Sequence, residues 1–590
     1  MMASSSTFEA KVLMAKGKRA AAAYIHADCS NATSPKHLNE VLDNLLNPAK
    51  AIDEWETIDW CKWLMAGGRT PDEFSSTVRT YDNATTCGLV WTPNFVAYRC
   101  RTCGISPCMS LCTECFKKGN HQRHDFNMFL SQAGGACDCG DTSVMKETGF
   151  CDRHGPNKSV NNGNAPRDLM CVAEAMMPRI ILRLIQHLRE NSKIPGADKT
   201  AIQEADAFIT MLLDFNNMGG LMRRVMTQAL TNPQMYRLLN EVPNPPVTDY
   251  AQYMAELRRI YEEALRSLPN PESTNDDIRD GATPDLLVHK TFLEELVFWT
   301  VKFEFPQKVV CLLLNMLPDV DYKEALTRAF VLHYSRISMM LERSQDPDTL
   351  SNRVVHVSVQ LFSNESLALR MTEQLNLLHI MVVSLKYMMS KILIRNTLHI
   401  FDKNFHYVVD CGKSVMKEHC YWPLVSDLNN VLSHRPVALK FMADDSLLEM
   451  WFVFLSMFQG MNVNQRELNQ HVEFEPNTYY AAFSAELEAS AYPMWALVSH
   501  LTDNTTAYLT RKLLSVCLAS LMEWFDAINF YNPTVDDSLQ VSFHLPLHRY
   551  LAVFLCQAVA KQGIMLNEVL PAPDVLHLLM MHPLRVQVSF

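Results

Sequence analysis

The sequence predicts a mainly α-helical protein in which a small cysteine-rich module precedes a large, irregular scaffold of helical-repeat type. Two counts lead to this prediction, because the chain of 590 residues contains only 19 Gly but 17 Cys, and neither is spread evenly. Nine Cys and nine Gly fall between residues 87 and 163, whereas residues 164–590 hold only seven Gly. The latter frequency is about a quarter of the ~7% that globular proteins average. With 48% hydrophobic residues, the chain is also too apolar to be disordered.

Residues 1–84 are expected to form an N-terminal helical region. Apolar residues recur there at helical spacing, for example at Val41, Leu42 and Leu45, and the pair Gly67-Gly68 is a suitable helix stop. We predict no signal peptide, because basic residues interrupt every apolar run near the N-terminus, namely Lys11, Lys16, Lys18 and Arg19.

Residues 85–156 are predicted to form a zinc module with little regular secondary structure. Paired ligands let one turn of backbone present two sulfur or nitrogen atoms to a single tetrahedral ion. Five such pairs occur here: Cys100 with Cys103, Cys112 with Cys115, His121 with His124, Cys137 with Cys139, and Cys151 with His154. Cys87 precedes them. In a thiol-reducing compartment this pattern favours metal ligation over disulfides.

The number of these ligands predicts how many ions the module holds. Without Cys108, the module offers eight Cys and three His. Three tetrahedral ions require twelve ligand positions, so three Zn(II) ions fit eleven residues only if one thiolate bridges two ions. Because every pair consists of thiolates or imidazoles, the zinc is expected to be structural rather than catalytic.

The module resembles the UBR box, the zinc module of the E3 ubiquitin ligases called N-recognins, in the order of its motifs: Cys, C-x2-C, C-x2-C, H-x2-H, C-D-C-G-D and C-x2-H. Within these ligases, the helical remainder is most similar to the third member of the animal UBR series. The resemblance covers residues 87 to about 154. It implies three ligand sets: Cys100, Cys103, His121 and His124; Cys87, Cys112, Cys115 and Cys137; and Cys115, Cys139, Cys151 and His154. Cys115 would then be the bridging ligand.

The resemblance also implies a shallow acidic pocket that captures the free N-terminus of a substrate protein. Asp138 and Asp141 match two of its carboxylates, which suit cationic donors. From their spacing alone, both could equally form a turn or support the adjacent metal ligands. Ser106 stands where the family has a third carboxylate, and Cys108 and Ala136 also depart from members that prefer basic residues. We therefore expect an altered specificity, for small or uncharged N-termini, or no classical N-degron binding at all.

Residues 165–590 are predicted to form the helical scaffold. Apolar stripes at helical spacing and the scarcity of Gly favour helices over sheets. An exposed loop is expected near 268–285, and the apolar ending at Phe590 leads us to expect a protein truncated at its C-terminus. The predicted helical segments include 166–191, 201–217, 285–316, 321–344, 365–395, 445–460, 508–529 and 548–564.

Composition limits the partners and the location of the protein. The formal charge of −11 argues against nucleic acid as a partner, and residues 87–154 carry seven basic against six acidic side chains. No stretch reaches the ~20 apolar residues that a membrane span requires. We expect a cytoplasmic protein, with room for a nuclear pool.

Two function classes remain open. In the first, the chain is the substrate-recognition part of a RING-type ligase of the N-degron pathway, which directs proteins to ubiquitin-dependent degradation. No RING pattern and no catalytic residue is recognised in this sequence, so E2 and ubiquitin would bind regions outside it. In the second, the chain is a zinc-stapled helical scaffold that binds partners through its helices and uses the box only structurally. The later cysteines are isolated and are predicted to be buried packing residues.

Overall fold

The computed structural model describes residues 3–31, 36–91, 94–106, 109–131, 135–158, 163–193, 198–271, 288–397, 405–409, 414–459, 484–527 and 546–570. Contacts divide the chain into two compact units. The first unit comprises Met1–Pro269 and Asp280–Phe330, and the second comprises Asn270–Arg279 and Val331–Phe590.

The first unit begins with the predicted N-terminal helical region, which consists of several short helices. A left-handed Gly67, with φ of 64°, ends α4, and Thr70 and Glu73 form a capping box that starts α5. The elements before the cysteine-rich module are α1 (Ala3–Ala15), α2 (Lys18–Asn31), α3 (Lys36–Leu45), the π-helical turn η1 (Glu54–Ile58), α4 (Asp59–Ala66) and α5 (Pro71–Thr80).

The cysteine-rich module contains more regular structure than the little that its sequence predicts. Strands β3, β2 and β4 form an antiparallel sheet in that order, in which Ala97 lies opposite both Cys112 and Phe129. Strands β1 and β5 form a second pair, with Val90 opposite Ala136. The elements are β1 (Val90–Trp91), β2 (Phe95–Cys100), β3 (Leu111–Cys112), α6 (Thr113–Lys118), β4 (Phe126–Ser131), β5 (Gly135–Ala136) and the 3-10 turn η2 (Glu147–Gly149).

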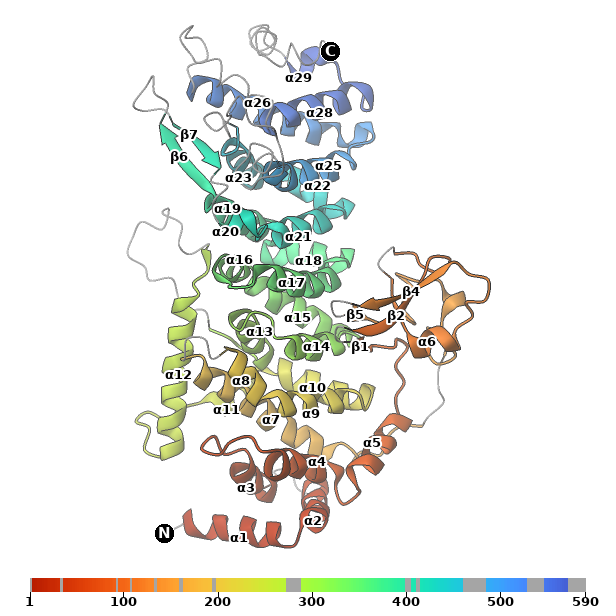
Figure 1. Ribbon diagram of the computed structural model, residues 1–590, viewed down its shortest axis with the longest axis vertical. Helices are drawn as coiled ribbons and strands as arrows, with labels where there is room; N and C mark the ends of the chain where they lie inside the picture. The colour runs from red at the N-terminus through yellow and green to blue at the C-terminus, as the bar shows by residue number, and fades with distance from the viewer. Residues whose placement is uncertain are drawn as a thin grey trace. The chain divides into compact units, whose positions relative to one another are not determined.

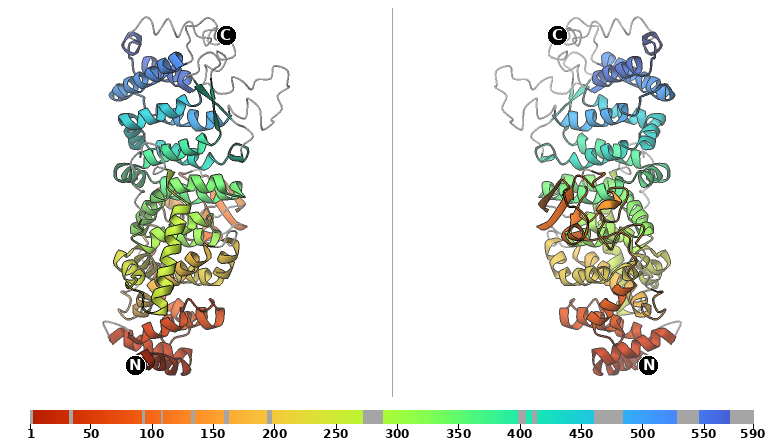
Figure 2. Two further views of the ribbon diagram at one scale, coloured as in Figure 1. Left: turned by 90° about the vertical axis from the view of Figure 1, so that its left-hand side faces the viewer. Right: turned by 90° about the vertical axis from the view of Figure 1, so that its right-hand side faces the viewer.

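The remainder of the first unit is helical, and the module lies against the side of its helices α14 and α15 (Figures 1 and 2). The predicted segment 285–316 divides into α13 and α14 because Glu304 and Phe305 adopt positive φ just before Pro306. The predicted loop near 268–285 falls mostly on 272–287, which lie outside the described residues. The helices are α7 (Cys171–Asn191), α8 (Asp198–Glu204), α9 (Asp206–Asn216), α10 (Gly220–Thr231), α11 (Pro233–Asn240), α12 (Asp249–Ser267), α13 (Phe292–Lys302), α14 (Gln307–Asn315) and α15 (Val320–Leu332).

The second unit continues with short helices packed through apolar faces. The predicted segment 365–395 divides at Asn376, whose left-handed φ of 52° ends α18, and segment 321–344 divides at His333. Its elements are α16 (Tyr334–Arg343), α17 (Pro347–Phe362), α18 (Glu365–Leu375), α19 (Leu377–Ser390), β6 (Leu393–Thr397), β7 (Phe405–Val409), α20 (Ser414–Lys417), α21 (Trp422–Leu432), α22 (Arg435–Ala443), α23 (Asp445–Ser456), η4 (Leu487–Ala491), α25 (Tyr492–Val498), η5 (Asn504–Thr506), α26 (Ala507–Ala527), α28 (Pro546–Ala560) and α29 (Leu566–Val569).

Large apolar side chains form the cores of the helical regions. Trp299 and Phe298 are fully buried in the first unit, and Trp451 and Tyr421 are fully buried in the second. Such residues bury the largest areas of any side chain and dominate the energetics of a core. Among the described residues, none of the helices is both long and apolar enough to cross a bilayer.

Candidate metal centre

The cysteines and histidines of the module gather into three groups, in each of which the ligand atoms lie within 4.8 Å of one another. All eleven predicted ligands are brought together, and one residue, Cys115, belongs to two groups. The groups are Cys100, Cys103, His121 and His124; Cys87, Cys112, Cys115 and Cys137; and Cys115, Cys139, Cys151 and His154.

The short elements of the module place these ligands. Cys100 ends β2, Cys112 ends β3, and Cys115 lies in the first turn of α6. The antiparallel pairing of the sheet places Cys112 opposite Ala97 of β2, and Cys100 opposite Phe126 of β4. Phe116 of α6 packs face to face on the ring of His121, with the centroids 4.5 Å apart, which restrains that imidazole.

The separations between sulfur and nitrogen atoms fit zinc. Cys103 Sγ lies 3.2 Å from His124 Nδ1, and Cys151 Sγ lies 3.1 Å from His154 Nδ1. Cys115 Sγ is 3.4 Å from the same nitrogen of His154. A tetrahedral zinc ion, with Zn–S near 2.3 Å and Zn–N near 2.0 Å, separates such atoms by roughly 3.5 Å.

Backbone amides donate to two of the sulfur ligands, and neighbouring thiols lower the pKa of Cys139 but raise the pKa of Cys137. The amide of Cys112 donates to Cys137 Sγ at 3.2 Å, and the amide of Cys151 donates to Cys139 Sγ at 3.3 Å. The thiol of Cys115 lowers the pKa of Cys139 to about 4. Eight of the eleven ligands are buried and the other three, Cys87, His124 and His154, are half-buried. A set made only of thiolates and imidazoles is typical of structural zinc rather than of a catalytic ion with an open position.

The carboxylates of Asp138 and Asp141 lie on the loop that passes between two metal groups. Asp138 Oδ2 accepts from the amide of Ser110 at 2.7 Å, and Asp141 Oδ1 accepts from the amide of Ser143 at 2.8 Å. The amide of Asp141 donates to the carbonyl of Asp138 at 3.1 Å, so the two residues share one turn. Burial raises the pKa of Asp138 to about 7.

Ser106, the third residue predicted for the pocket, belongs to the loop that follows Cys103. Its amide donates to the carbonyl of Val144 at 3.1 Å, which ties that loop to the segment just after Asp141. The structure thus places all three predicted pocket residues on adjoining loops. Cys108 lies outside the described residues, and Ala136 lies in β5.

Two family models match the chain. Residues 86–154 match the zinc finger in N-recognin, the UBR box, and residues 279–518 match the UBR1/2/3-like ARM repeat domain. The chain belongs to the UBR family of E3 ubiquitin-protein ligases. The UBR box therefore binds zinc, and the helices around 279–518 are ARM-type repeats.

Curated relatives extend this likeness along the whole chain. The chain is 58% identical to the E3 ubiquitin-protein ligase Ubr3 of Drosophila melanogaster over 99% of this chain and 26% of that protein. It is 48% identical to human UBR3 over 90% of this chain and 31% of that protein. It is 21% identical to human UBR1 over 68% of this chain and 25% of that protein. The chain thus spans about a quarter to a third of the length of these relatives.

The other cysteines do not form a further cluster of metal ligands in the described parts of the chain. Cys311, Cys420 and Cys517 are buried, as predicted. Cys171 at the start of α7 is only half-buried and Cys556 of α28 is exposed, so the prediction of burial is wrong for these two. Cys411 lies outside the described residues. One group without any spacing signal in the sequence brings Glu9 and His37 together with Glu40, all at least partly exposed.

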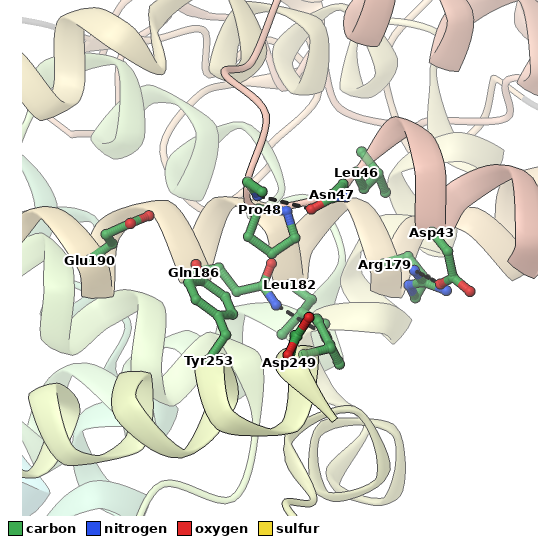
Figure 3. A pocket seen from close by; sticks show the side chains of 12 residues that line it. Asp43, Leu46, Asn47, Pro48, Arg179, Leu182, Gln186, Glu190, Asp249 and Tyr253 are labelled. Carbon is green, nitrogen blue, oxygen red and sulfur yellow. Dashed lines mark hydrogen bonds and ion pairs between the residues drawn. The ribbon is translucent and has the colours of Figure 1, made fainter. Parts of the chain in front are cut away.

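A cleft of about 690 Å³ lies in the first unit away from the UBR box, between α3, α7 and the start of α12 (Figure 3). Arg179 and Asp43 form an ion pair of 2.6 Å at one end, and Gln186 Nε2 donates to the hydroxyl of Tyr250 at 3.2 Å. The described residues that line it include neither cysteine nor histidine. Sequence patterns could not reveal this cleft, because its walls come from segments far apart in the chain.

Proposed function

We propose that the UBR box of this chain holds three zinc ions, with Cys115 bridging two of them. The eleven ligand atoms in three groups and the presence of Cys115 in two groups support this assignment. Bound zinc would supply rigidity, because structural zinc ions contribute ~10 to 16 kcal/mol of apparent binding energy to small modules. The residues of the chain would then present a fixed loop that carries Asp138 and Asp141.

We further propose that the chain is the substrate-recognition part of a RING-type UBR ligase, in which the box captures free protein N-termini for ubiquitin-dependent degradation. The observation that carries this proposal is the shared turn of Asp138 and Asp141 between metal ligands. A free α-ammonium group donates charge-assisted hydrogen bonds to such carboxylates. E2 and ubiquitin would bind parts of the full-length protein outside this chain.

The specificity of this site is proposed to differ from a preference for basic first residues. Ser106 supplies a neutral hydroxyl where the UBR-box pattern has a carboxylate. A neutral group cannot replace the Coulomb attraction of a carboxylate for a guanidinium or ammonium group. Small or uncharged first residues should therefore bind at least as well as arginine.

Calorimetric titration of the zinc-loaded chain with peptides that differ only in their first residue tests this function. Peptides that begin with Ala or Met should bind, and N-acetylation should abolish binding because it removes the α-ammonium group. Asp141→Asn should weaken binding at least tenfold, whereas Glu147→Gln, the same charge change on an exposed side chain of the box, should not. Tight, selective binding of Arg-first peptides would contradict the proposed specificity.

A second candidate function rests on the hydrogen bonds that both carboxylates make within their own loops. Asp138 accepts from Ser110 and Asp141 accepts from Ser143, which are structural tasks. In this alternative the box only stiffens a scaffold whose helices bind partners. It is favoured if Asp138→Asn and Asp141→Asn retain zinc and leave every peptide titration unchanged.

A further inference from the structure

One face of the sheet in the UBR box exposes large apolar side chains to solvent. Phe126, Met128 and Leu130, at alternate positions of β4, are 45%, 63% and 56% exposed. Val96 of β2, which is 39% exposed, lies opposite Leu130, and Tyr98 lies opposite Met128. Side chains at alternate positions of paired strands share one face of a sheet. These five residues therefore form a continuous patch, the apolar sheet face.

The strand β4 is also an edge of its sheet. The strands are ordered β3-β2-β4, and β2 is the only strand that pairs with β4 in the part of the chain that the structure describes. In Figure 1, β1 and β5 lie nearer the helices than β4 does. Native proteins protect edge strands with charged side chains, proline, bulges or a covering segment, because an open edge pairs readily with another strand. The sequence of β4, FNMFLS, has no charge and no proline, and its pairing with β2 has no bulge. A covering segment is therefore expected.

The hydrogen bonds around β2 show which backbone groups of β4 are open. The amide of Arg101 donates to the carbonyl of Asp125, directly opposite it in the antiparallel register, at 2.8 Å. The hydroxyl of Thr113, just after β3, accordingly donates to the carbonyl of Val96 at 3.1 Å, on the other side of β2. Bonds between antiparallel strands involve alternate residues. The odd-numbered residues of β4 therefore bond to β2, and the even-numbered residues direct their amides and carbonyls outward.

The outward-facing backbone groups of β4 thus belong to the residues that carry the apolar sheet face, namely Phe126, Met128 and Leu130. A strand added at this edge would bond to their amides and carbonyls and cover their side chains at the same time. Phe116 of α6 borders the patch, because its ring stacks on Tyr98 with the centroids 4.1 Å apart and lies 4.8 Å from the ring of Phe126. This packing fixes one side of the surface and leaves the outer side open.

We propose that a segment of the full-length protein outside this chain adds to β4 as a fourth strand of the sheet in the UBR box. The segment is extended and carries apolar side chains at alternate positions. The curated relatives are long enough to provide it, because this chain spans 26% of Drosophila melanogaster Ubr3 and 31% of human UBR3. The inference does not rest on the proposed capture of N-termini, since Asp138 and Asp141 lie between β5 and η2, outside this sheet.

The size of the patch favours a tethered segment over a second copy of the chain or a separate protein. The exposed fractions of Val96, Phe126, Met128 and Leu130 correspond to roughly 400 Å² of apolar surface, the size of the largest patch on an ordinary monomer. Stable complexes between separate proteins bury ~800 Å² on each partner. A segment of the same polypeptide binds at an effective concentration in the millimolar range, so it can occupy a surface that is too small to hold a free partner.

Hydrogen exchange resolved to single amides tests the added strand by comparing this chain with the full-length protein. The amides of Met128 and Leu130 point outward and should exchange at least tenfold more slowly in the full-length protein, where the added strand accepts from them. The amides of Asn127 and Phe129 bond to β2 and are the internal control, with equal protection in both proteins. Equal exchange of Met128 and Leu130 in the two proteins would overturn the proposal.

Leu130→Lys in the full-length protein tests the apolar contact. A charge on an edge strand opposes pairing, so this variant should return the amides of Phe126 and Met128 to the fast exchange of the shorter chain. Leu238→Lys is the matched control, because Leu238 of α11 is 51% exposed and lies in no sheet. Both variants should keep their zinc, which elemental analysis checks. Protection that persists in Leu130→Lys would contradict the docking of an apolar strand.

A photoreactive amino acid in place of Met128 identifies the occupant of the apolar sheet face. After irradiation of cells that express the full-length protein, we expect a cross-link to a segment of the same polypeptide outside this chain, without an increase in molecular mass. A cross-linked species of twice the mass would assign the surface to a second copy. A cross-link to a different protein, or no cross-link at all, would equally overturn the proposal.

Discussion

The UBR box and the helical regions bury their cores by different means. Seven of the thirteen residues in the hydrophobic cluster of the box are cysteines, and only five of the others have large apolar side chains, namely Trp91, Met109, Leu111, Met145 and Phe150. The helical regions instead bury tryptophan, phenylalanine and leucine, together with a few paired charges. A module with so little apolar area depends on metal ligation, whereas an apolar core is stable without it. The same chain therefore contains one region that a chelator should unfold and another that it should leave intact.

Removal of zinc ligands gives the largest expected effect. Cys115→Ala breaks two ligand groups and should release two zinc ions per chain, whereas Cys103→Ala breaks one and should release one. Each structural site contributes ~10 to 16 kcal/mol of apparent binding energy, so the part of the box around each broken group should lose its structure, while the remaining ligand groups keep their zinc and the helical circular dichroism persists. Metal content by elemental analysis checks the ratio.

Cys311→Ala is the matched control for these variants. Cys311 is buried in α14 and belongs to none of the three groups. The Cys311→Ala variant should retain all the zinc, and its free energy of unfolding should fall only by the lost packing of the side chain. Equal zinc contents in Cys115→Ala and Cys103→Ala would rule out the bridging role of Cys115.

A buried ion pair in the first helical unit should produce the next largest effect. Glu295 is fully buried, and its carboxylate accepts from Arg189 at 2.5 and 2.6 Å, from Tyr236 at 2.6 Å and from Trp299 at 3.0 Å. Glu295→Ala leaves the guanidinium of Arg189 buried and unpaired, which should lower the free energy of unfolding by about 3 to 5 kcal/mol.

Urea unfolding of the full chain measures this loss. Glu256→Ala removes a solvent-exposed carboxylate that pairs with Arg259 and should leave the midpoint nearly unchanged. Zinc content should stay the same in both variants. If Glu295→Ala lost zinc as well, the separation between the two kinds of core would be wrong.

A buried carboxylate that pairs with no cation among the described residues gives a pH-dependent effect in the second unit. Asp427 is buried and accepts from the hydroxyls of Tyr334 at 2.9 Å and Ser358 at 2.5 Å, and burial raises its pKa to about 7. The unfolded value is ~3.9, so the folded state binds the proton more tightly. Its contribution to stability is therefore present below about pH 4 and is lost as the pH rises to about 7, by up to about 4 kcal/mol.

Unfolding free energies at pH 5 and pH 7.5 test this sign. Asp427→Asn should flatten the fall in stability over this interval, because its side chain does not titrate. Asp348→Asn, at an exposed position of α17, should keep the slope of the unaltered chain. An unchanged slope in Asp427→Asn would show that other groups are responsible.

Local spacing made the metal ligands predictable. Pairs such as Cys100 with Cys103 approach one ion because a single turn of backbone joins them, and all eleven predicted ligands lie in three groups. The sheet of the box was not predicted, since strands such as Leu111–Cys112 are too short to show an alternating pattern. The sequence predicts continuous helices over 321–344 and 365–395, because apolar stripes continue across His333 and Asn376, but the structure breaks the helices at both residues.

The family, the mainly helical fold and the zinc chemistry all follow from residues that are near neighbours in the sequence, where backbone geometry alone brings ligands or apolar faces together. The environment of Asp138 and Asp141 does not. Only the tertiary structure shows which helices lie beside their box, because β1 contacts α14 and Gly88 packs against Pro318 just before α15. Contacts between segments so far apart in the chain leave no local pattern in the sequence, so the packing of the box onto the helices was decided by the tertiary structure.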